Sequence, residues 1–154
     1  SIPKTVNEGD TLVVGCISAD FTGYNQFMDV DMNTSKMTSI YEITFENHDD
    51  MSTFSVKPDK DGYFIIKNMK KDIEYSISAV KIEKHSNSGA YVTVGCKIDR
   101  DKRRIFTPLS EKVTNFGTVF FHFDGKANTV YWEYGNYPKT KGYFKSLKEG
   151  SENE

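Results

Sequence analysis

The most informative part of the chain reads Pro58-Asp59-Lys60-Asp61-Gly62-Tyr63-Phe64-Ile65-Ile66-Lys67-Asn68-Met69. A polar turn ending in Asp61-Gly62 stands between two runs in which apolar and polar residues alternate. Asp-Gly between such runs is a strong short-range signal for a β-hairpin. The sequence therefore predicts a hairpin here, with one strand at 52–57 and the next at 62–67.

The same period-two alternation recurs along most of the chain, which is typical of β-strands with one buried face. It predicts further strands at 11–18, 40–46, 73–82, 90–98, 116–124 and 128–134, the last two as a second hairpin around Gly125-Lys126-Ala127. Short, evenly spaced strands separated by Gly, Asn and Asp favour an antiparallel sandwich or barrel. We therefore expect an all-β protein, an antiparallel β-sandwich of about seven or eight strands.

With 154 residues, the chain has room for one domain with a substantial core. We expect a flexible N-terminal segment at 1–9, a single sandwich domain at 10–144, and a polar tail at 145–154. The region 19–39 lacks a clear period and indicates a long loop after the first strand. A short C-terminal helix is predicted at 141–148.

The charge balance excludes an electrostatic drive toward nucleic acid or anionic lipid, because the net charge is −2 and the pI about 5.9. The most basic stretch, 97–104, holds five cations but also Asp99 and Asp101. We interpret it as a solvated turn rather than a phosphate-binding patch.

No apolar run has the length that a membrane span requires, and residues 1–10 lack the apolar region of a signal peptide. A start at Ser1-Ile2-Pro3-Lys4 without an initiator Met suggests a mature or trimmed chain. The frequent use of Lys, Asn, Ile and Tyr resembles the composition of AT-rich bacterial envelope proteins. We expect a secreted or envelope-associated protein, with lipid anchoring through a removed segment as one alternative.

The two cysteines lie in similar contexts, Leu12-Val13-Val14-Gly15-Cys16 and Val92-Thr93-Val94-Gly95-Cys96. Alternation places both on apolar faces, so we expect both to point into the core. A disulfide between Cys16 and Cys96 is one alternative, and two buried free thiols are the other. Although Val13-Val14-Gly15-Cys16 resembles a lipoprotein cleavage site, the polar residues before it indicate a strand cysteine.

The pattern Asp61-Gly62-Tyr63-Phe64, then Asn68-Met69, then Tyr75-Ser76-Ile77 resembles the signature of transthyretin-like β-sandwiches. These domains are also called prealbumin-like or carboxypeptidase-regulatory-like, and Cna-B modules are related to them. Met69 stands where the family has Leu, and 70–74 replaces its Pro-Gly turn. The resemblance covers about residues 10–83 and implies a transthyretin-like fold, with ligand binding at a homodimer seam as one use of that fold.

The sequence offers no motif for catalysis, since it contains no Gly-x-Ser-x-Gly, phosphate loop or His-Glu-x-x-His. Asp59-Lys60-Asp61-Gly62 fails as a calcium loop because the bidentate Glu is missing. The histidines stand apart in sequence, and the mixed ligands at 28–37 (Met28, Asp29, Asp31, Met32, Met37) select no single metal well. We therefore expect no enzyme, no metal site and no cofactor.

The C-terminal aromatics are the best candidates for ligand contact. Alternation places Trp132 and Tyr134 on one face of the last strand and Tyr131 on the other. One face must be core, and the other would present rings beside polar groups. The candidate ligand-binding residues are Tyr131, Trp132, Tyr134 and Tyr137.

Three functions remain open at the level of sequence. The first is a non-catalytic module for protein contact, adhesion or assembly, with a protein or glycan partner and homodimerisation as an option. The second is a carbohydrate-binding module that uses the C-terminal aromatics. The third is a carrier of a small molecule or metal, indicated by the methionines at 28–37.

Overall fold

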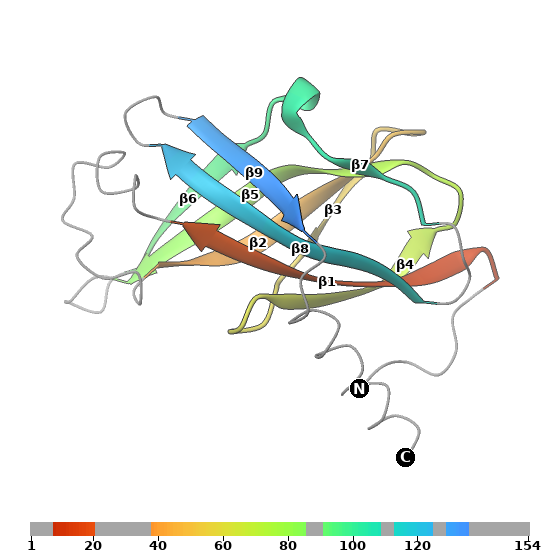
Figure 1. Cartoon of the computed structure of the whole chain (residues 1–154), viewed down its shortest axis with the longest axis horizontal. Helices are drawn as coiled ribbons and strands as arrows, with labels where there is room; N and C mark the ends of the chain where they lie inside the picture. Colours follow the sequence, from red (N-terminus) through yellow and green to blue (C-terminus); the bar gives the residue numbers. More distant parts are fainter. Residues whose placement is uncertain (1–7, 21–37, 86–90, 109–112, 125–128, 136–154) are drawn as a thin grey trace, which may run out of the picture.

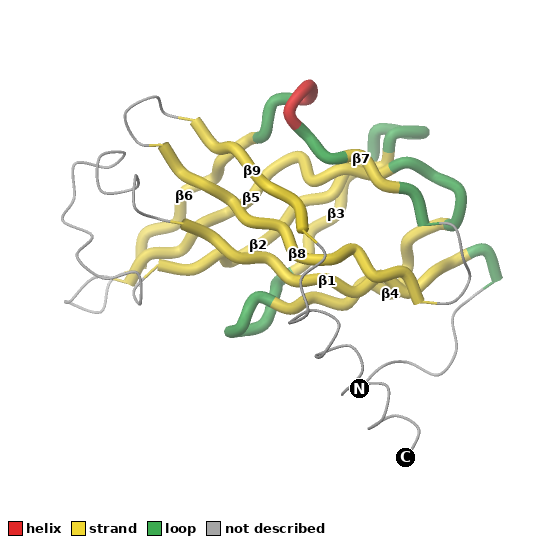
Figure 2. The backbone as a smooth tube through the Cα atoms, viewed as in Figure 1, coloured by secondary structure: helices red, strands yellow, loops and turns green. Residues whose placement is uncertain are grey.

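The computed structural model describes residues 8–20, 38–85, 91–108, 113–124 and 129–135, which form two β-sheets packed face to face (Figures 1 and 2). Sheet A has the order β4 (Tyr63–Lys70), β1 (Asp10–Asp20), β8 (Val113–Asp124), β9 (Thr129–Gly135). Sheet B has the order β3 (Thr53–Val56), β2 (Thr38–Asn47), β5 (Tyr75–His85), β6 (Tyr91–Lys97), and β7 (Ile105–Phe106) also pairs with β5. The short 3-10 helix η3 (Arg100–Lys102) lies between β6 and β7.

The all-β sandwich prediction is confirmed, and each of the eight predicted strands overlaps an observed one. The expectation of a purely antiparallel fold is wrong, because β1 and β8 pair in parallel. Alternation reveals strands but not their partners, and a parallel pair joins segments that are far apart in sequence. The two-residue β7 was not predicted, since it is too short to show a period.

The predicted hairpin at Asp61-Gly62 is also wrong. β3 pairs with β2 in sheet B, whereas β4 pairs with β1 in sheet A, so the turn carries the chain from one sheet to the other. The Asp59 carboxylate accepts hydrogen bonds from the N–H groups of Asp61 and Tyr63, each at 2.9 Å. Gly62 has φ of +90°, and a Cβ there would lie 2.1 Å from the Ile17 carbonyl oxygen. The turn therefore packs against β1 and requires glycine for two reasons.

The second predicted hairpin is confirmed, because β8 and β9 pair in antiparallel register from Thr118–Gly135 to Asp124–Thr129. Its connecting residues, 125–128, lie outside the described residues. The predicted helix at 141–148, the tail at 145–154 and most of the predicted loop at 19–39 also lie outside the described residues. The loop begins later than predicted, because β1 extends to Asp20.

Phe45 on β2 lies at the centre of the core and is fully buried. Its ring centroid is 5.5 Å from that of Phe54, 6.0 Å from Phe64 and 6.4 Å from Phe116, so rings from both sheets meet there. Aromatic pairs at such separations stabilise a core beyond the effect of area alone. Phe64, Tyr75 and Ile77 all belong to this core.

The cysteines are free thiols on different sheets, so the disulfide alternative is not realised in this structure. Cys96 on β6 belongs to the core between the sheets, as expected. Cys16 is only 1% exposed, but it alternates with the core residues Val13 and Ile17 and so lies on the other face of β1. Alternation misplaced it because both faces of β1 are apolar.

Candidate functional site: the arginine cluster at one end of sheet B

The candidate site is built by an interruption in an edge strand. Both β6 and β7 pair with β5: Lys97 lies opposite Ala79, and Ile105 lies opposite Ser76. The two short strands therefore act as one edge strand, and the chain between them, 98–104, loops out of the sheet. This loop carries Arg100, Arg103 and Arg104.

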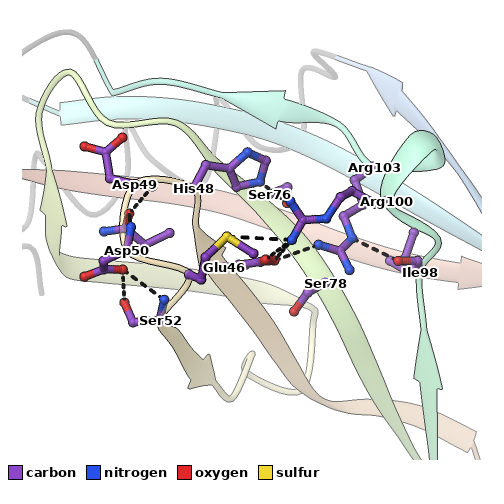
Figure 3. Close-up of polar contacts among 12 residues, drawn as sticks. Glu46, His48, Asp49, Asp50, Ser52, Ser76, Ser78, Ile98, Arg100 and Arg103 are labelled. Atoms are coloured by element: carbon purple, nitrogen blue, oxygen red, sulfur yellow. Dashed lines mark hydrogen bonds and ion pairs between the residues drawn. The ribbon is translucent and has the colours of Figure 1, made fainter.

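Two of these arginines bind one carboxylate, that of Glu46 on β2 (Figure 3). Arg100 Nη2 lies 2.6 Å from Glu46 Oε1, and Arg103 Nη1 lies 2.9 Å from Oε2. Glu46 is 6% exposed although its strand position faces away from the core, because the loop covers it. We call Glu46, Arg100 and Arg103 the arginine cluster.

Arg103 is the more deeply held of the two arginines, since its side chain is 13% exposed against 57% for Arg100. Arg103 Nε also donates to the Ile98 carbonyl oxygen at 2.9 Å, which closes the loop on itself. A buried charge pair of this kind needs both its ionic partner and its additional hydrogen bonds to be tolerated. Arg100 therefore remains the exposed member of the cluster.

The third arginine joins the two sheets. Arg104 Nη1 donates to the carbonyl oxygen of Phe116 on β8 at 3.0 Å, and its guanidinium lies 4.5 Å from the centroid of that ring. A small apolar cavity beside it is lined by Ile77, Ile98, Arg104, Phe116, Val119 and Phe121. The loop is thus anchored to β2 within sheet B and to β8 in sheet A.

The turn between β2 and β3 borders the cluster. Asn47 Oδ1 accepts from the Asp49 N–H at 2.8 Å, and Asp50 Oδ1 accepts from the Ser52 hydroxyl at 2.6 Å. The bonds from Ser52, first from its hydroxyl and then from its backbone, lower the pKa of Asp50. Met51 has a positive φ of 65° in this turn, and its Sδ lies 3.8 Å from Arg100 Nη2.

Two large apolar side chains on this side of sheet B are exposed, Met51 at 53% and Ile105 at 51%. Ile105 pairs with Ser76, and Ser76 pairs with Glu46, so Ile105 lies two strands from the cluster, about 10 Å away. Met51 contacts Arg100 on the other side. We call Met51, Arg100 and Ile105 the contact surface: Met51 and Arg100 touch each other beside the buried Glu46 carboxylate, and Ile105 is exposed on the same side of sheet B.

The chemistry open to the cluster is limited, because both oxygens of Glu46 accept hydrogen bonds from arginine. His48 Nε2 lies 2.7 Å from Ser76 Oγ. Ser76 is fully buried, so a substrate cannot reach its hydroxyl. Among the described residues, no group of three His, Cys, Asp or Glu side chains could hold a metal ion. The methionines at 28–37 lie outside the described residues.

The predicted ligand-contact residues lie elsewhere, on sheet A. Tyr131, Trp132 and Tyr134 belong to β9, where they pair with His122, Phe121 and Val119. Tyr137 lies outside the described residues, and the side chains of β9 are not described. The structure therefore gives the strand and the register of these candidates and does not bring them to the arginine cluster.

Sequence reasoning missed the arginine cluster. The interpretation of 97–104 as a solvated turn holds for the exposed pair Lys102–Asp99, at 3.6 Å, and is wrong for Arg103 and Arg104. The presence of three arginines directly after the apolar strand at 90–98 could have indicated the cluster, because Arg is the usual partner of a buried carboxylate. The carboxylate itself lies 54 to 57 residues earlier.

The comparisons with known proteins leave the family open. No family model matches the chain, and no curated protein matches it. The NMR structure of a protein from Eubacterium rectale is similar at 10% sequence identity and a TM-score of 0.32, over 85% of this chain and 93% of that one. Within the part of the chain that is described, no helix is long and apolar enough to cross a membrane.

Proposed function

We propose that the chain is a non-catalytic interaction module of a secreted or envelope-associated bacterial protein and that it acts through protein contact. The observation that carries this proposal is the contact surface, where Met51, Arg100 and Ile105 are exposed together. Methionine and arginine are enriched in protein interfaces, and exposed apolar side chains beside them provide area to bury.

The arginine cluster prepares this surface for binding. The Glu46 carboxylate accepts hydrogen bonds of 2.6 and 3.2 Å from Arg100 Nη2, and these bonds fix the position of the guanidinium. A side chain that is already ordered loses less conformational entropy when a partner binds. The remaining donors of Arg100 can then meet a carboxylate or a backbone carbonyl of a partner protein.

We further propose that the sandwich is transthyretin-like. Two observations support this finer assignment: Asp61-Gly62 leads into β4, and Phe64, Tyr75 and Ile77 share the core. These are the residues on which the sequence resemblance rests. The fold by itself does not supply the partner, because one fold can host many functions.

The register of β9 weighs against the carbohydrate-binding alternative. Residues paired across antiparallel strands share a face of the sheet. Positions 132 and 134 pair with Phe121 and Val119, which belong to the core. We therefore favour protein contact at sheet B over sugar stacking on Trp132.

The proposal is tested by photo-crosslinking in intact cells of the organism that makes the protein. The photoreactive amino acid p-benzoylphenylalanine replaces Met51 in one variant and Ile105 in another. A third variant carries it at Lys67, an exposed position on β4 in sheet A. We expect the first two variants to crosslink to the same protein, identified by mass spectrometry, and the third not to.

A charge variant makes the test specific. Arg100→Glu should abolish the crosslink from position 105, because a partner that pairs with the guanidinium would then meet a like charge. Equal crosslinking from positions 51, 67 and 105, or no crosslink from 51 and 105, would contradict the proposal.

A further inference from the structure

The side chain of Met51 is both exposed and hydrogen-bonded. It is 53% exposed, so a small molecule dissolved in water can reach its sulfur. At the same time, Arg100 Nη2 donates to Met51 Sδ at 3.8 Å. The other methionine among the described residues is Met69, which is fully buried in the core. Of these two methionines, Met51 is therefore the one whose sulfur is open to chemical modification.

The hydrogen-bond partner of this sulfur is a cationic donor with a fixed position. Arg100 Nη2 carries two hydrogens, and its other partner is the Glu46 carboxylate, at 2.6 and 3.2 Å. Glu46 is 6% exposed and is also bound by Arg103, so it holds the Arg100 guanidinium in place. A thioether sulfur is only a weak acceptor. The N–H donated to Met51 thus has a poorer partner than it could bind.

We propose that Met51 is a site of oxidation by peroxides and that Arg100 binds the sulfoxide that forms. A lone pair of the sulfur attacks one oxygen of hydrogen peroxide. The S–O bond forms as the O–O bond breaks, and the departing hydroxide takes up the proton that the transferred oxygen loses. The products are methionine sulfoxide and one water, so the sulfur loses two electrons and the peroxide gains them. Methionine sulfoxide reductases can reverse the change.

The distance between the two side chains fits the oxidised product. A sulfoxide oxygen accepts a hydrogen bond better than a thioether sulfur does, and its bond to a guanidinium is charge-assisted. An S–O bond of about 1.5 Å and a hydrogen bond of about 2.8 Å, at an angle of about 120° at the oxygen, place sulfur and nitrogen about 3.8 Å apart. Met51 Sδ and Arg100 Nη2 already lie 3.8 Å apart. Their separation therefore need not change when the oxygen is added.

Oxidation of Met51 changes the contact surface. It converts an apolar side chain into a polar one, and it engages a donor of Arg100 within the molecule. We therefore expect peroxide to weaken the binding of a partner protein at this surface. This consequence rests on the proposed function, whereas the oxidation of Met51 and its coupling to Arg100 do not.

The first measurement is the oxidation rate of each methionine in the purified, folded chain with hydrogen peroxide, followed by peptide mass spectrometry. We expect Met51 to be oxidised at least about tenfold faster than Met69, because susceptibility follows exposure of the sulfur. Equal rates at the two methionines would overturn the proposal.

The second measurement is the shift of the urea midpoint on oxidation, under conditions in which Met69 stays reduced. The shift in Met51→Leu is subtracted, which removes the effect of the other methionines. We expect the difference to be a rise of about 0.2–0.5 M, as one added hydrogen bond would give, and to vanish in the Arg100→Ala background. No rise, or the same rise in the Arg100→Ala background, would overturn the proposal. Since no partner takes part, such a failure leaves the proposed function standing, and missing crosslinks leave the oxidation standing.

Discussion

The buried carboxylate of Glu46 is stabilised by the two arginines that pair with it. It is 6% exposed and receives hydrogen bonds from Arg100 and Arg103. Removing one member of a buried pair leaves the other charge without a partner, which costs more than the pair itself contributes. The burial of Arg103 makes it the member most affected by loss of Glu46.

We predict that Glu46→Ala lowers the free energy of unfolding by about 3–5 kcal/mol, measured by urea denaturation. Arg100→Ala should cost only about 1 kcal/mol, because its side chain is 57% exposed and Arg103 still pairs with Glu46. Lys102→Ala serves as the control, since its pair with Asp99 is exposed on both sides. Equal losses for Glu46→Ala and Lys102→Ala would contradict the structural role of the cluster.

Two buried acids make the protein sensitive to alkali. Burial raises the pKa of Cys96 above its ordinary value of 9.0 and that of Tyr75 above 10.0. An acid with a higher pKa in the folded state binds its proton more tightly when folded. The free energy of unfolding is therefore unaffected below the ordinary pKa values and falls as the pH rises through them.

We predict that the urea midpoint falls between about pH 8 and about pH 10.5, and that the fall is smaller in Cys96→Ala. The difference in slope between the two proteins is the readout, because the substitution also changes packing at every pH. Parallel curves for Cys96→Ala and the wild-type protein would show that this thiol does not contribute.

Among the elements, the Asp61-Gly62 turn shows where local patterns mislead. Its Asx hydrogen bonds and its glycine are local features, and they are equally compatible with a hairpin and with a crossing between sheets. The contact with Ile17 selects the crossing between sheets over the hairpin, because the Ile17 N–H donates to the Gly62 carbonyl oxygen at 2.7 Å. The sequence therefore predicted the turn correctly and its partner strands wrongly.

We predict that Gly62→Ala destabilises the protein by more than about 2 kcal/mol, because it combines strain at a positive φ with a clash against Ile17. Gly95→Ala is the matched control on β6, where an added Cβ meets nothing within 4 Å. That variant should change the free energy of unfolding by less than about 1 kcal/mol. Thermal or urea unfolding of the two proteins side by side decides the matter.

At the scale of the whole molecule, the fluorescence of Trp132 tests whether position 132 lies on the core face of β9, as its register indicates. Position 132 pairs with Phe121, which is 1% exposed. We predict a blue-shifted emission maximum and weak quenching by acrylamide for this single tryptophan. A red-shifted, readily quenched signal would return the carbohydrate-binding alternative to first place, and a glycan screen would follow.

The sequence by itself determined the strands and the all-β class. Alternation of apolar and polar residues involves only neighbours in the chain, so it can be recognised before the fold is known. Alternation places Phe64 and Ile66 on one face of their strand, and both belong to the core.

Only the tertiary structure decided the pairing and the candidate site. The parallel contact of β1 with β8, the second buried face at Cys16, and the binding of Arg103 to Glu46 all join residues that are distant in the chain. The free energy that selects such contacts comes from burying apolar area and pairing charges across the whole molecule. No local pattern in the sequence contains that information, because each partner is defined only once the sheets have packed.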